Sequence, residues 1–173
     1  MKKVLALVLV MMMAFCISAM AEETPVLGFL PPAMTSPFYA SCIEGAQPVA
    51  DALGYELKVL APPSEDDYAT QTSMMEDFIT QGVAGIAVCG INLEALKPAI
   101  TKANEAGIPV VMFNTITELE GVDVYAYSGY NQYNGGAKIA DWVNEQTGGT
   151  AKVAIIEGLP SDYTTQRMGG FVD

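Results

Sequence analysis

Uncharged polar and aromatic side chains gather in the segments that follow the predicted strands of this sequence. Phe38 and Tyr39 stand at the first turn of a predicted helix. Asn92 follows one short apolar run, and Asn114 and Thr115 follow another. Asparagine combines a hydrogen-bond donor with an acceptor, which suits sugar hydroxyls, and an aromatic face can cover the apolar C–H side of a sugar ring. These residue types indicate binding of a small polar solute.

Several of these side chains have a structural alternative. Tyr39 also fits the apolar stripe of its helix, whereas Phe38 lies off that stripe. Asn92 stands where a helix begins and could simply cap it. Asn114 is the strongest candidate for ligand contact because it directly follows apolar residues 108–113, at the carboxyl end of a predicted parallel strand.

Ligands of open parallel α/β sheets bind beyond the carboxyl ends of the strands. The segments expected at that edge are residues 31–39, 61–67, 90–93, 114–117 and 128–131, and the last of them contains Asn131.

The composition excludes most catalytic chemistry. The chain has no histidine, so Ser-His-Asp and Cys-His catalysis are excluded and the commonest transition-metal ligand is missing. Phosphate-loop, dinucleotide-binding and nucleophile-elbow motifs are also absent from the sequence. Glu157 and Asp162 could form an acid pair, but the sequence offers no cleft around them. We expect neither catalytic activity nor a cofactor or metal.

Acidic residues outnumber basic ones, 20 to 8, which gives a formal charge of −12. This balance disfavours nucleic acid as a partner. Arg167 is the only arginine, so a strongly anionic ligand would find little to pair with. The preferred explanation of the acidic excess is that it keeps an exported protein soluble.

Residues 1–21 have the layout of a secretory signal peptide. Two lysines precede an apolar run, and Ala19-Met20-Ala21 forms a cleavage site. We expect cleavage and export to the periplasm or another extracytoplasmic space, with an uncleaved N-terminal anchor as the alternative. Cys16 follows a bulky phenylalanine, which disfavours a lipid anchor. Whether Cys42 and Cys89 pair in that oxidising space stays open.

Short β-rich runs alternate with amphipathic stretches at intervals of about 30 residues, the rhythm of βα units in a parallel sheet. Strands are predicted at residues 26–30, 55–60, 85–89, 109–113, 124–127 and 152–156. Ser36 and Pro37 can cap and start the first helix, which ends at Gly54. Leu53 is expected on the inward face of this first helix. Later helices are predicted from Asp66 or Asp67, from Asn92, from about Tyr133 and after Ser161, and Ile139 is expected to point inward from the helix that starts near Tyr133.

A turn-rich segment near residue 128 divides the chain. We expect residues 22–128 to form a nearly complete N-terminal α/β lobe, a doubly wound parallel sheet, and residues 129–173 to begin a second lobe that is truncated. One strand with one and a half helices cannot bury its apolar surface. The sequence therefore has the pattern of a fragment of a longer protein.

Five short motifs carry a family resemblance: SPFY at residues 36–39, GA at 45–46, LGY at 53–55, ANEAGIPVV at 103–111 and RMGGF at 167–171. Together they resemble the type I periplasmic sugar-binding proteins, the ribose-binding-protein-like substrate components of ABC transporters. The resemblance implies two lobes that close on a ligand between them, delivery to a transporter permease, and a monomer at full length.

The resemblance also implies site residues. The ligand-stacking aromatic pair of the family falls on Phe38 and Tyr39, with a polar position at Ser36. The Asp-Arg pair that grips ribose falls on Asn114 and Thr115. Losing those charges implies a sugar other than ribose, or another polar solute.

In the second lobe, a ligand-binding arginine of the family falls on Thr165, and Arg167 matches a different arginine. The expected ligand-binding set is therefore Ser36, Phe38, Tyr39, Asn92, Asn114, Thr115, Asn131 and Thr165.

Three other kinds of protein could have this fold. A ligand-sensing extracytoplasmic domain of a receptor or chemotaxis system would share this fold. A sugar-responsive repressor is excluded, because a signal peptide takes the place of its DNA-binding segment. An enzyme on the same sheet would reveal itself by turnover. We also expect the 173 residues to bind solute weakly, because half of the contacts would be missing.

Overall fold

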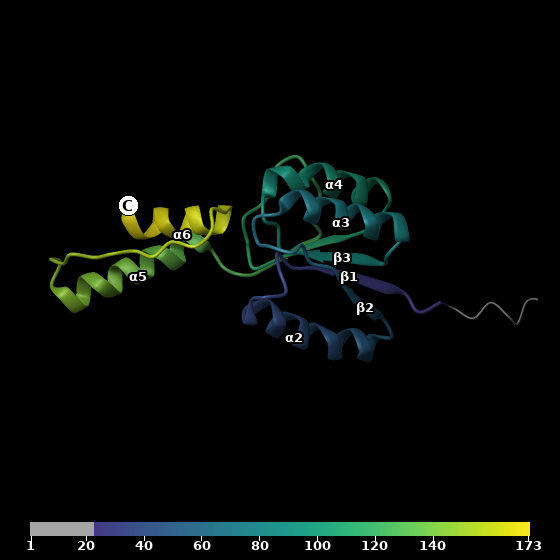
Figure 1. Cartoon of the computed structure of the whole chain (residues 1–173), viewed down its shortest axis with the longest axis horizontal. Coiled ribbons are helices and arrows are strands. Elements are labelled where there is room, and N and C mark those ends of the chain that lie inside the picture. The colour runs from purple at the N-terminus through teal and green to yellow at the C-terminus, as the bar shows by residue number, and fades with distance from the viewer. Residues whose placement is uncertain (1–22) are drawn as a thin grey trace, which may run out of the picture.

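The computed structural model describes residues 23–173, so the predicted signal peptide at residues 1–21 lies outside the described residues. Figure 1 shows two parts. Residues 26–128, here called the sheet body, form a sheet with helices on both faces. Residues 129–173, here called the helix pair, lie beside it and contain two helices that pack against each other.

The sheet is entirely parallel and confirms the predicted α/β class. Its five strands lie in the order β2-β1-β3-β4-β5. They are β1 (Val26–Leu30), β2 (Glu56–Val59), β3 (Gly85–Val88), β4 (Val110–Phe113) and β5 (Ala126–Ser128). Because all strands point the same way, their carboxyl ends and the loops that follow them meet at one edge.

Helices cover both faces of the sheet, as a doubly wound fold requires. One face carries α2 (Pro37–Leu53), and the other carries α3 (Tyr68–Gln81) and α4 (Leu93–Glu105) (Figure 1). Gly54 and Gly82 end α2 and α3 in the left-handed conformation, with φ of 76° and 66°. Glycine is the residue that adopts this backbone at least cost, which explains why the predicted helix ends are right.

Side-chain caps start two of these helices. Asp67 accepts a hydrogen bond from the Thr70 backbone N–H at 3.0 Å, and this bond lowers the pKa of the Asp67 carboxyl. Asn92 caps α4. Ser36 takes the N-cap position of α2, but its hydroxyl makes no capping bond. The expected serine cap is therefore wrong, and the fixed φ of Pro37 at the first helical position starts the helix instead.

The main hydrophobic core lies between the sheet and the α3–α4 face. Phe78, Met75, Leu96 and Ile100 are almost fully buried there, and each such side chain contributes about 1.5–3 kcal/mol. Gly28 of β1 allows Phe78 to lie directly on the strand, since a Cβ at Gly28 would stand 2.8 Å from the ring. This core fixes the strands whose ends form the edge.

The opposite face of the sheet is less covered. An open apolar hollow of about 680 Å³ lies beside α2, with Val49, Val111 and Tyr125 in its lining. Leu53 is 66% exposed, so its expected inward position is wrong. Among the strands, α2 contacts mainly β2, which is the outermost strand of the sheet.

Two predicted strands differ from the structure. β5 pairs Ala126 with Val111 and Ser128 with Phe113, so it starts two residues later than expected. Residues 152–156 form no strand and pair with none of the described strands, and Ile156 is 98% exposed. A β pattern becomes a strand only when a neighbour supplies hydrogen bonds, and the sheet body lies away from this segment (Figure 1).

The helix pair consists of α5 (Gln132–Thr147) and α6 (Asp162–Val172), which cross at two glycines. A Cβ at Gly136 would stand 2.0 Å from the Arg167 carbonyl oxygen, and one at Gly170 would stand 1.9 Å from that of Tyr133. Ile139 is 57% exposed, so its predicted inward position is wrong.

Among residues 23–173, no helix has the length and apolarity to cross a membrane. In the same residues the thiols of Cys42 and Cys89 are both free.

Candidate functional site

Asn114 stands at the carboxyl end of β4 in an unusual backbone conformation. Its φ is 63°, the left-handed region that asparagine tolerates better than most residues. The residue is 9% exposed, and its side-chain N–H donates to the Cys89 sulfur at 3.8 Å. The turn at β4 therefore directs this amide toward the end of β3.

A close backbone approach holds the next residue. Gly129, directly after β5, packs so closely against the loop after β4 that a Cβ at this position would lie 2.3 Å from the Thr115 nitrogen. Thr115 is fully buried, and its hydroxyl accepts a hydrogen bond from the Thr117 backbone N–H at 3.0 Å. The structure thus brings Asn114 and Thr115 together with Gly129, the first residue after β5.

Gln71 of α3 organises the loop between β3 and α4. Its amide donates to the Cys89 carbonyl and accepts from the Ile91 backbone N–H, both at 2.9 Å, and the side chain is 1% exposed. The sequence prediction missed this residue. The available signal was a polar residue in line with Met75 and Phe78 on the inward stripe of its helix.

Aromatic rings surround the ends of β1, β3 and β4. The Phe29 and Phe113 rings stack with centroids 4.7 Å apart, and Tyr39 meets Phe113 edge-on at 6.5 Å. Tyr39 is buried, whereas Phe38 is half exposed and touches the Tyr39 ring edge-on at 5.2 Å. Phe38 is the most exposed ring of this group.

The Cys89 thiol lies among polar groups from three other segments. It donates to the Tyr163 hydroxyl at 3.5 Å and lies 3.8 Å from the Tyr39 hydroxyl. Burial raises the pKa of the Cys89 thiol and of both tyrosines, which keeps all three groups protonated near neutral pH. The cluster can donate and accept hydrogen bonds but carries no charge.

An amide also bridges the two parts of the molecule. Gln132, at the start of α5, is fully buried and donates to the Asn114 carbonyl oxygen at 2.6 Å. Its side-chain oxygen accepts from Arg167 Nε at 2.5 Å. The Arg167 guanidinium also stands 5.9 Å from the centre of the Tyr130 ring. The arginine is therefore engaged within the helix pair.

The remaining predicted residues occupy helix starts and the surface. Asn92 accepts from the Ala95 backbone N–H at 2.9 Å and caps α4. Asn131 caps α5 by accepting from Asn134 at 2.8 Å. Ser36 is partly exposed at the start of α2, and Thr165 is exposed on α6. These residues come from different loops, and among the described residues no side-chain hydrogen bond joins Thr165 to the others.

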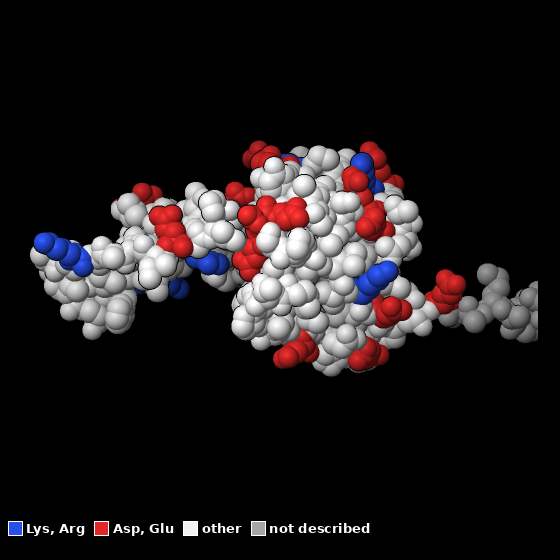
Figure 2. Space-filling model, viewed as in Figure 1, with Lys and Arg blue, Asp and Glu red and all other residues white. Residues whose placement is uncertain are grey.

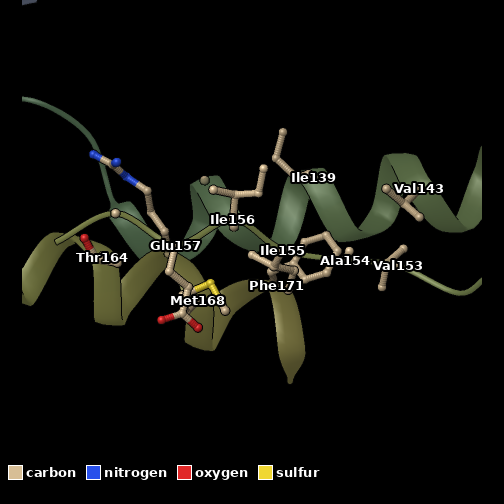
Figure 3. A pocket seen from close by; sticks show the side chains of 14 residues that line it. Ile139, Val143, Val153, Ala154, Ile155, Ile156, Glu157, Thr164, Met168 and Phe171 are labelled. Carbon is tan, nitrogen blue, oxygen red and sulfur yellow. The ribbon is translucent and has the colours of Figure 1, made fainter. Parts of the chain in front are cut away.

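A second hollow lies within the helix pair. Figure 3 shows apolar side chains of α5, α6 and the extended segment between them around a cavity of about 490 Å³. Ile139, Val153, Ile155 and Phe171 are among its lining residues. Its lining is mainly apolar, which does not suit a polar solute.

The charges in the described part of the chain are scattered. Figure 2 shows acidic side chains spread over the visible face of both parts, with few basic ones between them. No group of three or more metal-binding side chains occurs in residues 23–173. The Cys89–Tyr39 cluster offers hydrogen bonding by neutral groups together with aromatic contact. The Asp162 carboxylate lies at the same edge and accepts from the Leu93 backbone N–H.

The sheet body is a doubly wound parallel sheet with amides and aromatics at the carboxyl ends of its strands. Open α/β sheets of this class bind ligands at that place. A family model described as a periplasmic binding protein domain matches residues 27–173, and the chain belongs to this family.

Known relatives agree with this assignment. The ribose import binding protein of Bacillus subtilis is 31% identical over 79% of this chain, and that of Haemophilus influenzae is 27% identical over 98%. These matches cover 43% and 56% of the relatives, so the chain spans about half the length of the curated proteins it resembles.

Solved structures show the same fold. A periplasmic solute-binding protein from Actinobacillus succinogenes, with bound D-allose, matches 86% of this chain at 28% identity with a TM-score of 0.76. One from Burkholderia graminis, in complex with D-arabinose, matches 85% at 26% identity with a TM-score of 0.77. The chain corresponds to 54% and 50% of these structures.

Proposed function

We propose that this chain is part of an extracytoplasmic solute-binding protein that captures a small polar ligand, a sugar other than ribose, and delivers it to an ABC transporter without catalysing a reaction. The observation that supports this most directly is the geometry of Asn114. Its amide stands at the carboxyl end of β4, beside the neutral Cys89–Tyr39 cluster. A neutral cluster of this kind suits hydroxyl groups better than a carboxylate or phosphate.

The relatives support a sugar as ligand. Their names and titles mention ribose, allose and arabinose, so several sugars occur among proteins of this fold. Asn114 and Thr115 stand where the family resemblance leads one to expect a charged pair, which argues for a ligand other than ribose. The half-exposed Phe38 ring could cover one face of such a sugar.

The partition of the chain belongs to the same proposal. Residues 22–128 would form the first lobe, and residues 129–173 would begin the second. Residues 1–21 would direct export to the periplasm and then be removed. Ligand would bind between the lobes, with Ser36, Phe38, Tyr39, Asn92, Asn114, Thr115, Asn131 and Thr165 as the candidate contacts, and a full-length monomer would meet the transporter permease.

A thermal-shift screen tests this function. The chain, extended to the length of its relatives and without residues 1–21, is heated with individual sugars, polyols and other small polar solutes. A specific ligand at about 100 times its Kd stabilises the native state by roughly 2.7 kcal/mol and so raises Tm. We expect a shift with one class of sugar. Ligand turnover, or no shift with any sugar, would contradict the proposal.

An Asn114→Gly variant tests the site itself. Glycine accepts a φ of 63° and removes only the amide, so the fold should persist. We expect the ligand-induced shift in Tm to shrink or disappear. Asn134→Ala, an exposed position on α5, is the control and should retain the full shift.

A further inference from the structure

One face of α6 meets the sheet body. Asp162, Tyr163, Gln166 and Arg167 stand at i, i+1, i+4 and i+5 of this helix, which places them on one side. The first three make side-chain contacts with the edge, and Arg167 reaches it through Gln132. We call these four residues the contact face of α6. The sequence prediction does not include Asp162 or Tyr163 among the expected ligand-binding residues.

Asp162 joins the starts of two helices from different parts of the molecule. It is the first residue of α6, and its carboxylate accepts a hydrogen bond from the Leu93 backbone N–H at 3.1 Å. Leu93 is the first residue of α4, where Asn92 already satisfies the Ala95 N–H. The positive ends of both helix dipoles therefore favour this carboxylate, and its hydrogen bond is charge-assisted.

Tyr163, the residue after Asp162, adds an aromatic ring to the contact face of α6. It is 6% exposed and packs with Tyr39, Phe113 and Cys89 in a cluster separate from the main core. The Cys89 sulfur is fully buried and hydrogen-bonded to the Tyr163 hydroxyl at 3.5 Å. One turn farther along, the Thr117 hydroxyl donates to the Gln166 side-chain oxygen at 3.3 Å.

We propose that Asp162 and Tyr163 are positioning residues that hold the helix pair on the carboxyl edge through direct protein contacts, and that Cys89 is the buried thiol beneath them. The hydrogen bonds run between protein atoms, so this association needs no solute to bridge the two parts. A solute entering the edge competes with α6 for the same donors and acceptors. The inference rests on the proposed function only in treating this edge as the place of the solute.

Reactivity of Cys89 toward an aromatic disulfide reagent tests the proposal. The experiment uses the full chain with Cys16→Ser and Cys42→Ser, which leaves Cys89 as the only one of three thiols. Asp162 makes no hydrogen bond with Cys89, yet Asp162→Ala should speed labelling by about tenfold or more, because α6 separates from the edge more often. Asp162→Asn keeps an acceptor oxygen and should give an intermediate rate.

Two further variants separate the contact from other effects of Asp162. Asp141→Ala removes an equal charge from an exposed position on α5 and should leave the labelling rate unchanged. Gln166→Ala weakens the contact face without changing the charge at the start of α6, and it should raise the rate by a smaller factor. Circular dichroism verifies that each variant retains its helices.

The results distinguish the alternatives. Equal labelling rates for Asp162→Ala and Asp141→Ala would overturn the proposal. So would labelling of the parent chain as fast as that of the urea-unfolded chain, since Cys89 would then not be buried. The assay contains no solute, so a failed sugar screen leaves its outcome unaffected, and a failed thiol assay leaves the solute-binding proposal in place.

Discussion

At the scale of single residues, Gln71 shows how one side chain can shape a loop. The chain leaves the sheet after β3, so the Cys89 carbonyl and the Ile91 N–H lose their strand neighbours. Both groups are buried, and the amide of Gln71 satisfies both. Buried backbone groups without partners are costly, so this amide stabilises the loop that leads into α4.

Gln71→Leu removes the two hydrogen bonds and keeps an apolar side chain of similar size. We expect the free energy of unfolding to fall by about 3 kcal/mol, since each unsatisfied group costs about 1–3 kcal/mol. Urea denaturation followed by circular dichroism measures the loss. Gln47→Leu, at an exposed position on α2, is the matched control and should change it by less than about 0.5 kcal/mol. Equal losses in both variants would refute this role.

The sequence predicts the position of some candidate residues and misses other contacts, for a physical reason. Asn114 was predictable because it directly follows an apolar strand, and the structure places it at the carboxyl end of β4. Its left-handed backbone and the tight packing of Gly129 against Thr115 depend on the close approach of the loops after β4 and β5. Tyr163 lies 74 residues from Cys89 along the chain, so local patterns carry no information about that contact.

At the scale of elements, glycines have opposite roles in two helices. A Cβ at Gly170 would collide with the Tyr133 carbonyl oxygen of α5, whereas a Cβ at Gly45 in α2 would meet no atom within 4 Å. Helix propensity alone favours alanine over glycine by about 1 kcal/mol at both positions. The neighbours of each glycine therefore determine the sign of the substitution.

Gly170→Ala should separate α5 from α6 and destabilise the helix pair, while Gly45→Ala should stabilise the sheet body by up to about 1 kcal/mol. Urea denaturation reads both effects: fluorescence of Trp142, the only tryptophan, reports on α5, and circular dichroism reports on the whole chain. Stabilisation by Gly170→Ala would show that the two helices do not pack as closely as described.

Helices were easier to predict than the last strands. Capping residues and terminal glycines act within a few positions, so α3 and α4 begin directly after Asp67 and Asn92, as expected. A strand depends on a distant neighbour. Residues 152–156 have the composition of a strand but lack a partner among the described strands, and β5 takes its start from its register with β4.

At the scale of the whole molecule, the two parts are unequal. The sheet body has a sheet with helices on both faces, while the helix pair has two helices and an extended segment. A ligand held between two lobes needs contacts from both. The matched relatives are about twice as long, so their remaining length could supply those contacts.

Chain length should therefore control affinity. We expect isothermal titration calorimetry to detect weak or no binding of the ligand from the thermal screen by these 173 residues. The chain extended to the length of its relatives should bind it clearly. Equal affinity of the two chains would show that the sheet body and the helix pair already hold every important contact.

The unpaired segment 151–158 also affects how molecules behave toward each other. Its backbone N–H and C=O groups have no strand neighbour, and Val153, Ile155 and Ile156 expose apolar surface. Such a segment can pair with its counterpart in another molecule. The formal charge of −12 opposes that approach, and salt screens this repulsion with a Debye length of about 8 Å at 0.15 M.

Colloidal stability should consequently decline as salt is added. Light scattering of the 173-residue chain should show self-association that grows with ionic strength, and Ile156→Lys should suppress it by placing a charge on this segment. Val172→Lys, which adds the same charge at an exposed position of α6, is the control. Because residues 152–156 have no strand partner, the solubility of the chain depends on the electrostatic repulsion between molecules.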